Sequence, residues 1–391
     1  MQNPGIYLSI PFCRQKCTYC NFASAAFPAS LLDSYLRCLS SEITSRIPLW
    51  AQSELSISLQ TPADTVYLGG GTPSLLPAPR LDELLQLVRS EFSIPKNSEI
   101  TLEASPENVS PEQAAAWAAS GVNRVSMGVQ SMVLTELRAV GRMHSAQTVS
   151  STFAALRQAG IENISVDLIA GLPLQTSQSW RDSIDSLLAL RPTHFSVYML
   201  EVDEDSNLGR EILRSGNRFH ASDIPSEDQI ADFFIAACEQ LREAGYLHYE
   251  ISNFALPGME CRHNRKYWEG IPYFGFGVEA HSYDGTNRWA NTDSLDEYLQ
   301  IASQQKSPVV HSKSLNQKEK IEERLFLGLR QLAGISLSRM EKDFGVNPQN
   351  LFSDQFQEFA ACGWLVREGD YLRLTDSGVL FSNEVFAGLI S

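Results

Sequence analysis

The sequence of 391 residues lacks any apolar run approaching the ~20 residues that a helix needs to cross a bilayer. It also lacks the pattern of a secretory signal, because its first basic residue is Arg14 and no apolar core follows a charged segment. We therefore expect a cytoplasmic protein without a transmembrane segment. Peripheral association with a membrane is compatible with both absences.

Positive charge is scarce and unclustered. The chain has 31 Lys and Arg residues against 46 Asp and Glu residues, a formal net charge of −15, and no basic run. Such a chain has no overall attraction to phosphate backbones, so we expect no nucleic-acid partner. The seven cysteines are an odd number, and disulfides are not expected in a cytoplasmic chain. The composition, with 43% apolar and 20% charged residues, is that of a folded protein of two or three domains.

Short apolar runs alternate with amphipathic stretches through the first 245 residues. The runs predict six strands, at Gly5–Ile10, Asp64–Gly69, Glu99–Ala104, Val122–Val129, Ile164–Ile169 and His194–Leu200. Gly121, Gly160 and Gly245 each stand between a helical stretch and an apolar run, where glycine commonly ends a helix. Ser226 and Gln229 form a capping box that predicts the start of another helix. Repeated strand–helix units predict an α/β fold with a parallel sheet, either barrel-like or doubly wound.

The pattern changes in the last part of the chain. After residue 307, we expect helices over Leu325–Leu332, Ser336–Phe344 and Asn350–Cys362, then an alternating hairpin over Leu365–Leu374. This set resembles a winged helix, but it has no excess of basic residues, so we interpret it as a lid or docking domain. The expected division is a barrel of residues 1–245, an extension of residues 246–306 and a smaller helical, winged-helix-like domain of residues 307–391.

Three of the seven cysteines, Cys13, Cys17 and Cys20, lie close together directly after the first predicted strand. Thiolates are soft ligands that select zinc, Cu(I) or iron–sulfur clusters. A structural zinc site usually needs four protein ligands, and the next cysteine, Cys38, lies in a helical stretch. Three ligands suit a 4Fe–4S cluster with one iron left open. A structural zinc loop stays as an alternative.

The aromatic-rich C-x3-C-x2-C loop resembles that of the radical S-adenosylmethionine (SAM) superfamily. The resemblance implies a partial (β/α) barrel whose cluster binds the amino and carboxylate groups of SAM at its open iron. It also implies an electron donor that reduces the cluster, so that SAM is cleaved to a 5′-deoxyadenosyl radical. Whether the chain is an enzyme stays open at this point.

Glycines and polar side chains follow the next predicted strands. Gly69, Gly70 and Gly71 end the second strand, which suggests backbone in close approach to a ligand. Polar residues stand at or after later strand ends, at Glu103, Gln130, Arg142 and Asp167. Since polar groups inside strands are costly to bury without a partner, the series indicates a polar site.

The order and context of these residues resemble the oxygen-independent coproporphyrinogen III oxidase family. That resemblance implies that Tyr7, Gly70 and Glu103 contact the cluster-bound SAM. In that oxidase, further residues are assigned to a second SAM. The residues of this chain that match them are Gly71, Thr72, Gln130, Arg142 and Asp167. One position departs from the family, which usually has His where this chain has Ser9. Because serine does not titrate near neutral pH, the resemblance does not imply acid–base chemistry at this position.

Two departures separate this chain from the oxidase branch and favour the HemW heme-chaperone branch. Phe22 stands where the oxidase has an additional cysteine, and the oxidase's N-terminal extension has no counterpart before Tyr7. The chaperone branch also carries an HNxxYW signature, matched here by His263, Asn264, Tyr267 and Trp268, and followed by the run Gly275–Tyr283. An imidazole can bind heme iron, and aromatic rings can pack on a porphyrin face.

The sequence therefore predicts a heme chaperone that carries a 4Fe–4S cluster and SAM and passes heme to an acceptor protein. By family resemblance the acceptor is expected to be a respiratory enzyme. The alternative is the oxidase itself, which would decarboxylate coproporphyrinogen III in porphyrin biosynthesis. A structural zinc protein is the third interpretation.

Overall fold

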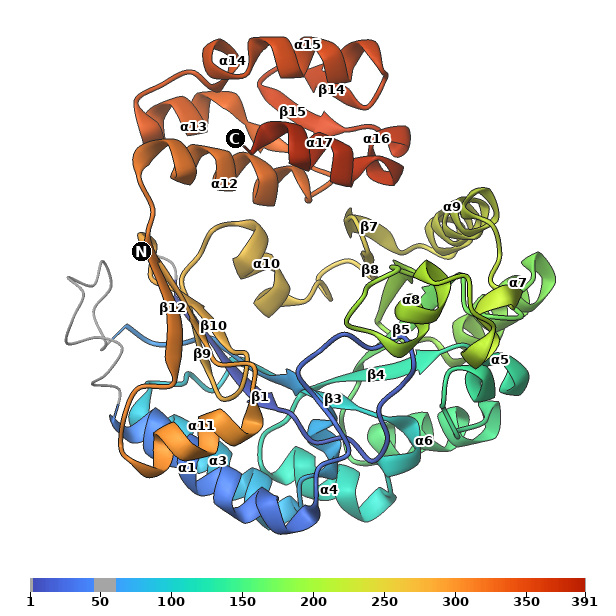
Figure 1. The fold of residues 1–391 in the computed structure, drawn as a ribbon, viewed down its shortest axis with the longest axis vertical. Coiled ribbons are helices and arrows are strands. Elements are labelled where there is room, and N and C mark those ends of the chain that lie inside the picture. Colours follow the sequence, from blue (N-terminus) through green and yellow to red (C-terminus); the bar gives the residue numbers. More distant parts are fainter. Residues whose placement is uncertain (1–2, 46–60, 391) are drawn as a thin grey trace.

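A large sheet with six parallel strands at its centre dominates the computed structural model, which describes residues 3–45 and 61–390 (Figure 1). These strands lie side by side in chain order: β1 Gly5–Ile10, β2 Thr65–Gly70, β3 Glu99–Ala104, β4 Arg124–Gln130, β5 Asn163–Ala170 and β6 His194–Met199. All six predicted strands are confirmed, with ends within two residues of those expected. The α/β fold with a parallel sheet is therefore confirmed.

Helices cover the outer face of this curved sheet (Figure 1). They are α1 Leu32–Ser45, α3 Ala78–Glu91, α4 Pro111–Ala119, α5 Leu134–Ala139, α6 Ala146–Gln158, α7 Ser177–Leu190 and α9 Glu227–Glu243. α8 Asn207–Leu213 instead lies beside the loop of the three cysteines, where the amide of Leu208 donates to the carbonyl of Thr18 (2.7 Å). Short 3₁₀ turns stand at Ala29–Leu31, Pro73–Leu75, Pro106–Asn108 and Arg218–Asp223. The predicted capping box of Ser226 and Gln229 starts α9. Gly121, Gly160 and Gly245 have φ values of +90°, +85° and +90°, which confirms the left-handed helix ends.

The segment after α9 extends the sheet at both of its edges. β7 Leu247–Glu250 and β8 Asn253–Ala255 lie beyond β6, and β9 Tyr273–Phe276 pairs in parallel with β1. Three antiparallel strands follow on that side: β10 His281–Tyr283, β11 Asn287–Asn291 and β12 Val309–Ser314. The segment also holds α10 Arg262–Trp268 and α11 Leu295–Ser303. Because the sheet runs across residues 245 and 307, the three-part division of the chain stays a prediction.

The C-terminal part forms a smaller domain of helices and a three-stranded sheet. Its elements are α12 Gln317–Leu329, β13 Ile335–Ser336, α13 Leu337–Phe344, α14 Pro348–Leu351, α15 Ser353–Ala361, β14 Leu365–Glu368, β15 Tyr371–Leu374, α16 Asp376–Leu380 and α17 Ser382–Leu389. The predicted hairpin is confirmed. The helix predicted to begin at Leu325 begins at Gln317, since Asn316 and Glu319 form a capping box there. β13, α16 and α17 were not predicted.

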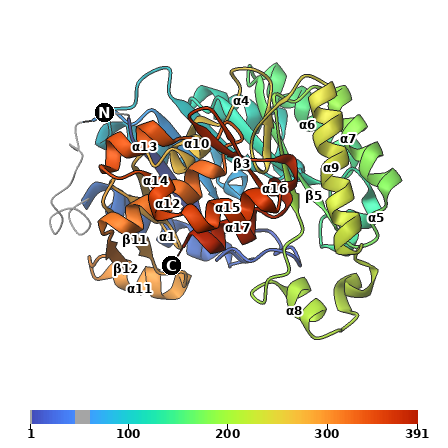
Figure 2. The same ribbon diagram turned by 90° about the horizontal axis from the view of Figure 1, so that it is seen from above.

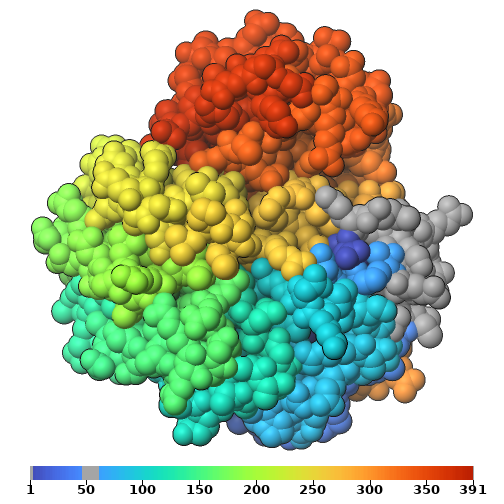
Figure 3. All heavy atoms as spheres, turned by 180° about the vertical axis from the view of Figure 1, so that it is seen from behind, coloured from blue at the N-terminus to red at the C-terminus, as the bar shows by residue number. Residues whose placement is uncertain are grey.

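The smaller domain lies over the inner face of the large sheet. It forms a lobe above the barrel when the molecule is seen from behind (Figure 3), and it crosses the middle of the sheet in the view from above (Figure 2). α10 lies between the sheet and this domain (Figure 1). Across residues 3–45 and 61–390, no helix combines the length and the apolar character that crossing a membrane requires.

Candidate functional site

The inner face of the sheet is polar because side chains alternate along each strand. In β1, Ile6, Leu8 and Ile10 are fully buried in the core. Tyr7 and Ser9 therefore point to the opposite, inner face. Strand pairing places matching polar residues on that face of the neighbouring strands, namely Tyr67 of β2, Glu103 of β3, Ser126 of β4, Asp167 of β5 and Ser196 of β6. The predicted series of polar strand residues thus lines one surface.

The loop with the three cysteines begins two residues beyond the end of β1 and is held by backbone hydrogen bonds. The amide of Cys13 donates to Ala25 (2.9 Å), and the amide of Cys20 donates to the carbonyl of Cys17 (3.2 Å). Cys13, Cys17 and Cys20 are half-buried free thiols, and burial raises the pKa of Cys20. Within the residues that the structure describes, no three metal-binding side chains are gathered into a ready site. The donor chemistry of three thiols on one loop fits a 4Fe–4S cluster.

Arg142 lies against the cysteine loop, as its guanidinium donates to the hydroxyl of Tyr19 (3.1 Å). It also donates to Ser105 Oγ (3.1 Å) and to the carbonyl of Gly128 (3.3 Å). Burial raises the pKa of Tyr19 above its usual range. Arg142 therefore stands as a positive charge between the loop and the end of β4.

The glycines at the end of β2 serve two different purposes. Gly70 has a φ of +100°, a conformation in which other residues are strained. A Cβ on Gly71 would lie 2.8 Å from the backbone of Ile10 and Phe12. The backbone at Gly71 therefore approaches the protein's own chain at the start of the cysteine loop, and its predicted contact with a ligand stays a prediction. Thr72, which follows, donates its hydroxyl to Cys13 Sγ (3.6 Å).

Glu103 carries a carboxyl group with an unusual environment. Burial raises its pKa to about 7, and the charge of Asp167 adds to this effect. The hydroxyl of Tyr67 donates to Glu103 Oε1 (2.8 Å), and the backbone amide of Gly70 also donates to the carboxyl. The ring of Tyr7 stacks on that of Tyr67, with centroids 6.1 Å apart. This carboxylate is a hydrogen-bond acceptor suited to the amino group of SAM, and the predicted contact of Glu103 with SAM stays a prediction.

Gln130 has two features that point to a bound molecule. Its φ of 67° is in the left-handed region, at a bulge where β4 ends, which is a strained position for glutamine. Its buried Oε1 atom has no hydrogen-bond partner among the described residues. Asp167 on the next strand accepts from Ser126 Oγ (3.3 Å), and burial raises its pKa. The unpartnered amide oxygen therefore fits a polar ligand such as the predicted second SAM.

Both ring nitrogens of His263 in α10 form hydrogen bonds within the protein. Its Nδ1 bonds with Thr65 Oγ1 (2.8 Å), and its Nε2 bonds with the hydroxyl of Tyr267 (2.9 Å). Burial, followed by the charge of Lys266, lowers its pKa to about 3. Asn264 is half-buried, and its amide donates to Cys261 Sγ (3.5 Å). The imidazole of His263 therefore offers no free nitrogen in this arrangement.

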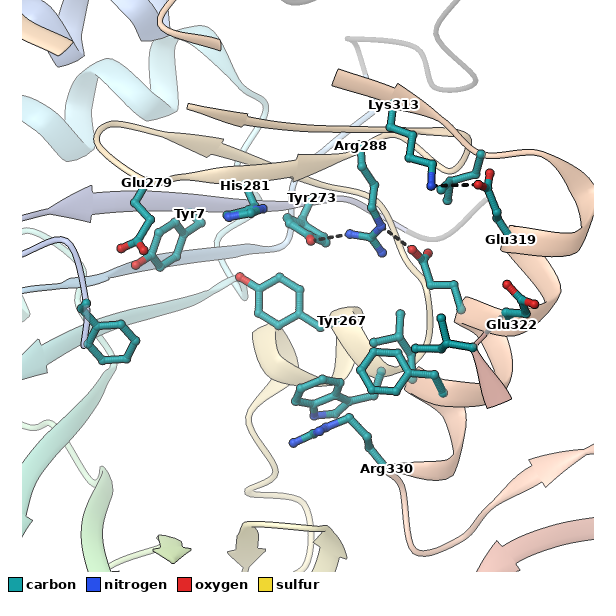
Figure 4. Close-up of a pocket in the computed structure, with 17 residues that line it drawn as sticks. Tyr7, Tyr267, Tyr273, Glu279, His281, Arg288, Lys313, Glu319, Glu322 and Arg330 are labelled. Carbon is teal, nitrogen blue, oxygen red and sulfur yellow. Dashed lines mark hydrogen bonds and ion pairs between the residues drawn. The ribbon is translucent and has the colours of Figure 1, made fainter. Parts of the chain in front are cut away.

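A cavity of about 880 Å³ lies between the inner sheet face, α10 and α12 (Figure 4). Its walls include Phe22 of the cysteine loop, Tyr267 and Trp268 of α10 and Phe326 of α12, and also Tyr7. Polar groups line it as well, namely Glu279, His281, Arg288, Lys313, Glu319, Glu322, Glu323 and Arg330. Two residues of the HNxxYW segment, Tyr267 and Trp268, thus line the cavity, whereas His263 and Asn264 do not. The sequence assigned no role to His281, Arg288 or Arg330.

Comparison with protein families matches residues 7–187 to the radical SAM superfamily and residues 315–381 to the HemN C-terminal domain. The chain is 34% identical to heme chaperone HemW of Bacillus subtilis over 98% of both chains. It is 33% identical to heme chaperone HemW of Lactococcus lactis, over 99% of this chain and 97% of that one. It is 31% identical to the bovine mitochondrial radical S-adenosyl methionine domain-containing protein 1, over all of this chain and 88% of that one.

Among solved structures, coproporphyrinogen III oxidase (HemN) from Escherichia coli is similar over nearly the whole chain. The TM-score is 0.85 at 23% identity, covering 99% of this chain and 90% of that one. At this identity the likeness establishes the fold alone. The predicted radical SAM type of barrel, with a smaller C-terminal domain, is thereby confirmed.

Proposed function

We propose, because the chain belongs to the HemW family of radical SAM proteins, that it is a heme chaperone that binds heme and transfers it to an acceptor protein. The observation that carries this proposal is the cavity between the barrel and the C-terminal domain. Its volume is that of a site for one sizeable organic ligand, and such sites combine apolar walls with a few polar groups. Heme has this combination of a flat apolar ring, an iron atom and two carboxylates.

Radical SAM proteins carry a 4Fe–4S cluster and SAM, and the cluster supplies an electron to SAM. We assign the cluster to Cys13, Cys17 and Cys20, with an electron donor as a further partner. The residues assigned to SAM are Tyr7, Gly70 and Glu103, with Gly71, Thr72, Gln130, Arg142 and Asp167 at a second SAM. In this assignment Glu103 accepts from the SAM amino group, and Gln130 offers its unpartnered oxygen.

For heme, the assigned residues are His263, Asn264, Tyr267 and Trp268. Tyr267 and Trp268 supply aromatic surface to the cavity wall, which excludes water from a porphyrin face. His263 acts on the cavity through its bond to the hydroxyl of Tyr267 and thereby orients that ring. The acceptor is proposed to be a respiratory enzyme, reached in the cytoplasm or at a membrane surface, with no nucleic acid involved.

The alternative function is coproporphyrinogen III oxidation in porphyrin biosynthesis. The similarity of fold to the Escherichia coli oxidase supports it. Against it stands Phe22, which occupies the position of the oxidase's additional cysteine and is 58% exposed at the cavity. A hydrophobic ring at that position favours a carrier over the oxidase.

The test is a titration of anaerobically purified protein with hemin, followed by the Soret band. We expect about one hemin per chain, and weaker binding by the variant in which Tyr267 and Trp268 are both replaced by Leu. Tyr371→Leu is the matched control, because Tyr371 is an exposed tyrosine of β15 that does not line the cavity. Absence of hemin binding by the unaltered protein would overturn the proposal.

The same protein, reconstituted with cluster, SAM and reductant, should fail to convert coproporphyrinogen III to protoporphyrinogen IX. Fluorescence of the oxidised porphyrin product after chromatography measures this conversion. Turnover at the rate of a biosynthetic enzyme would establish the alternative.

A further inference from the structure

The cavity wall formed by β9–β12 carries a histidine, His281, to which the comparisons with known proteins give no role. We propose that His281 is the protein ligand of the heme iron, in place of His263 of the HNxxYW segment. The proposal rests on the function proposed above and specifies where the heme lies.

His281 and His263 differ in what their rings contact. Both ring nitrogens of His263 are held by hydrogen bonds, and its side chain is 1% exposed. His281 is exposed, lines the cavity, and has no hydrogen-bond partner for its ring among the residues described. Figure 4 places it on the sheet wall, facing the cavity beside Tyr7 and Tyr273. Of these two histidines, only His281 therefore offers a ring nitrogen to a molecule in the cavity.

The pairing of β10 with its neighbouring strands explains why His281 points toward the cavity. Tyr283 pairs with Tyr273 of β9 and with Arg288 of β11, and Arg288 pairs with Lys313 of β12, so these four share one face of the sheet. His281 lies two residues before Tyr283 on the same strand and therefore points to that face. Tyr273, Arg288 and Lys313 all line the cavity.

The other polar groups of the cavity are poorer candidates for an iron ligand. The hydroxyl of Tyr267 is bonded to His263, and that of Tyr273 accepts from Arg288 (2.9 Å). The carboxylate of Glu279 accepts from the amide of Ala23 (2.9 Å). Cysteine and methionine are absent from the residues that line the cavity. Desolvation lowers the pKa of His281, so that its imidazole is neutral and has a lone pair at pH 7.

The far wall of the cavity offers donors for the heme propionates. The guanidinium of Arg330 lies over the ring of Trp268, 4.5 Å from its centroid. The buried atoms Arg330 Nε and Trp268 Nε1 both lack a hydrogen-bond partner in the described part of the chain. Buried donors without acceptors are costly, and a carboxylate would satisfy both. Figure 4 places Arg330 across the cavity from His281, so the candidate iron ligand and the cation stand on opposite walls of one cavity.

The experiment compares hemin binding by His281→Ala and His311→Ala. His311 is the matched control, because both histidines pair with Ala290 from opposite sides and share one sheet face, yet His311 does not line the cavity. We expect His281→Ala to weaken hemin binding at least tenfold and to lose the Soret band of histidine-bound heme. His311→Ala should match the unaltered protein. Free imidazole should restore the band in His281→Ala, which a merely structural role would not allow.

The outcomes separate the two proposals. If the unaltered protein binds no hemin, the proposed function fails and this inference fails with it. If it binds hemin and His281→Ala has the same affinity and spectrum, the inference is wrong and the chaperone function stands. Should His281→Ala fail to fold, His281→Leu replaces it, because leucine cannot bind iron, and an unchanged Soret band and affinity in that variant would also overturn the inference.

A second measurement tests whether Arg330 binds the heme propionates. Arg330→Gln should weaken the binding of hemin severalfold, yet leave the binding of hemin dimethyl ester unchanged, because the ester has no propionate charge. Equal effects of Arg330→Gln on hemin and on its ester would contradict the proposed orientation of the heme.

Discussion

At the scale of single residues, the proposed contact of Glu103 with SAM predicts that SAM binding depends on pH. Its pKa of about 7 means that the carboxylate fraction falls about tenfold for each pH unit below 7. Only the carboxylate accepts strongly from the N–H groups of the SAM amino group, so SAM affinity should be about tenfold lower at pH 6 than at its plateau above pH 8. Calorimetric titration of the protein with SAM across this range measures the effect.

The matched variant is Glu103→Gln, which keeps the shape of the side chain without its ionisation. It should bind SAM more weakly than the unaltered protein at pH 8 and with little dependence on pH. If SAM affinity has the same pH profile in both proteins, Glu103 does not contact SAM.

The cluster assignment predicts different outcomes for two half-buried cysteines. Cys17→Ser should lose most of the iron and acid-labile sulfide after anaerobic reconstitution, because serine is a poor ligand for iron. Cys38→Ser should keep both, since Cys38 lies on α1, outside the loop. Full cluster content in Cys17→Ser, or stoichiometric zinc without sulfide, would contradict the assignment.

Some site residues could be predicted from sequence and others could not, for a geometric reason. Cys13 and Glu103 stand at recognisable positions of a local pattern, a three-cysteine spacing and a strand end. His281 and Arg330 carry no local pattern that distinguishes them. They meet at one cavity only because β10 joins the far edge of the sheet and α12 folds back over it. Pairing between distant segments is not encoded in the periodicity of either segment.

At the scale of elements, α10 is fixed to the sheet through its first turn. Glu99 at the start of β3 accepts from the backbone amides of Arg262 and His263, both at 3.0 Å. A carboxylate at a helix N-terminus satisfies otherwise unpaired amides. His263 adds its ring bond to Thr65 of β2. This anchorage positions Tyr267 and Trp268 at the cavity.

This anchorage predicts a loss of stability in acid. The pKa of His263 is lowered from 6.5 to about 3, so the folded state favours the neutral ring. The contribution of His263 is fully present above pH 6.5 and is lost as the pH falls from 6.5 toward 3. Between pH 7.5 and pH 5 the loss should be about 2 kcal/mol in the free energy of unfolding. Urea denaturation at the two pH values measures it.

His263→Asn should be less stable at pH 7.5 and should lose about 2 kcal/mol less than the unaltered protein on acidification. His220→Asn is the control, since His220 is exposed on the 3₁₀ turn Arg218–Asp223. An identical pH dependence in His263→Asn and the unaltered protein would contradict this account.

The elements themselves differed in how well the sequence predicted them. β1–β6 were placed closely because each is a short apolar run between turn signals. α12 was predicted too short, because its first two turns are charged and polar apart from Ile321, and only the Asn316 capping box marks the start. β13, of two residues, is too short for any periodicity and exists through its pairing with β15.

At the scale of the whole molecule, an ion pair ties the C-terminal domain to the large sheet. Arg288 of β11 is paired with Glu323 of α12, with side-chain exposures of 28% and 20%. Because both side chains are mostly buried, this pair should have a coupling free energy of about 1–2 kcal/mol, between those of surface and buried ion pairs. We expect that value from a double-mutant cycle with Arg288→Met and Glu323→Gln on heme-free protein.

The pair Arg339–Asp343 within α13 is the control, since its side chains are 67% and 50% exposed. Its coupling should be at most about 0.5 kcal/mol. A coupling for Arg288 and Glu323 no larger than that of the control would mean that the ion pair does not hold the domain.

The parallel pairing of β1 with β9 has a consequence for biosynthesis. Gly5 lies opposite Tyr273, so β1 leaves the ribosome well before β9, the strand that pairs with its second edge. At ordinary rates of translation, that interval is on the order of tens of seconds. Throughout it, the strand that carries Ile6, Leu8 and Ile10 has an open edge, and open apolar edges attract other chains. Nascent chains should therefore depend on cellular folding factors, and a ribosome-bound product that stops at residue 245 should aggregate upon release.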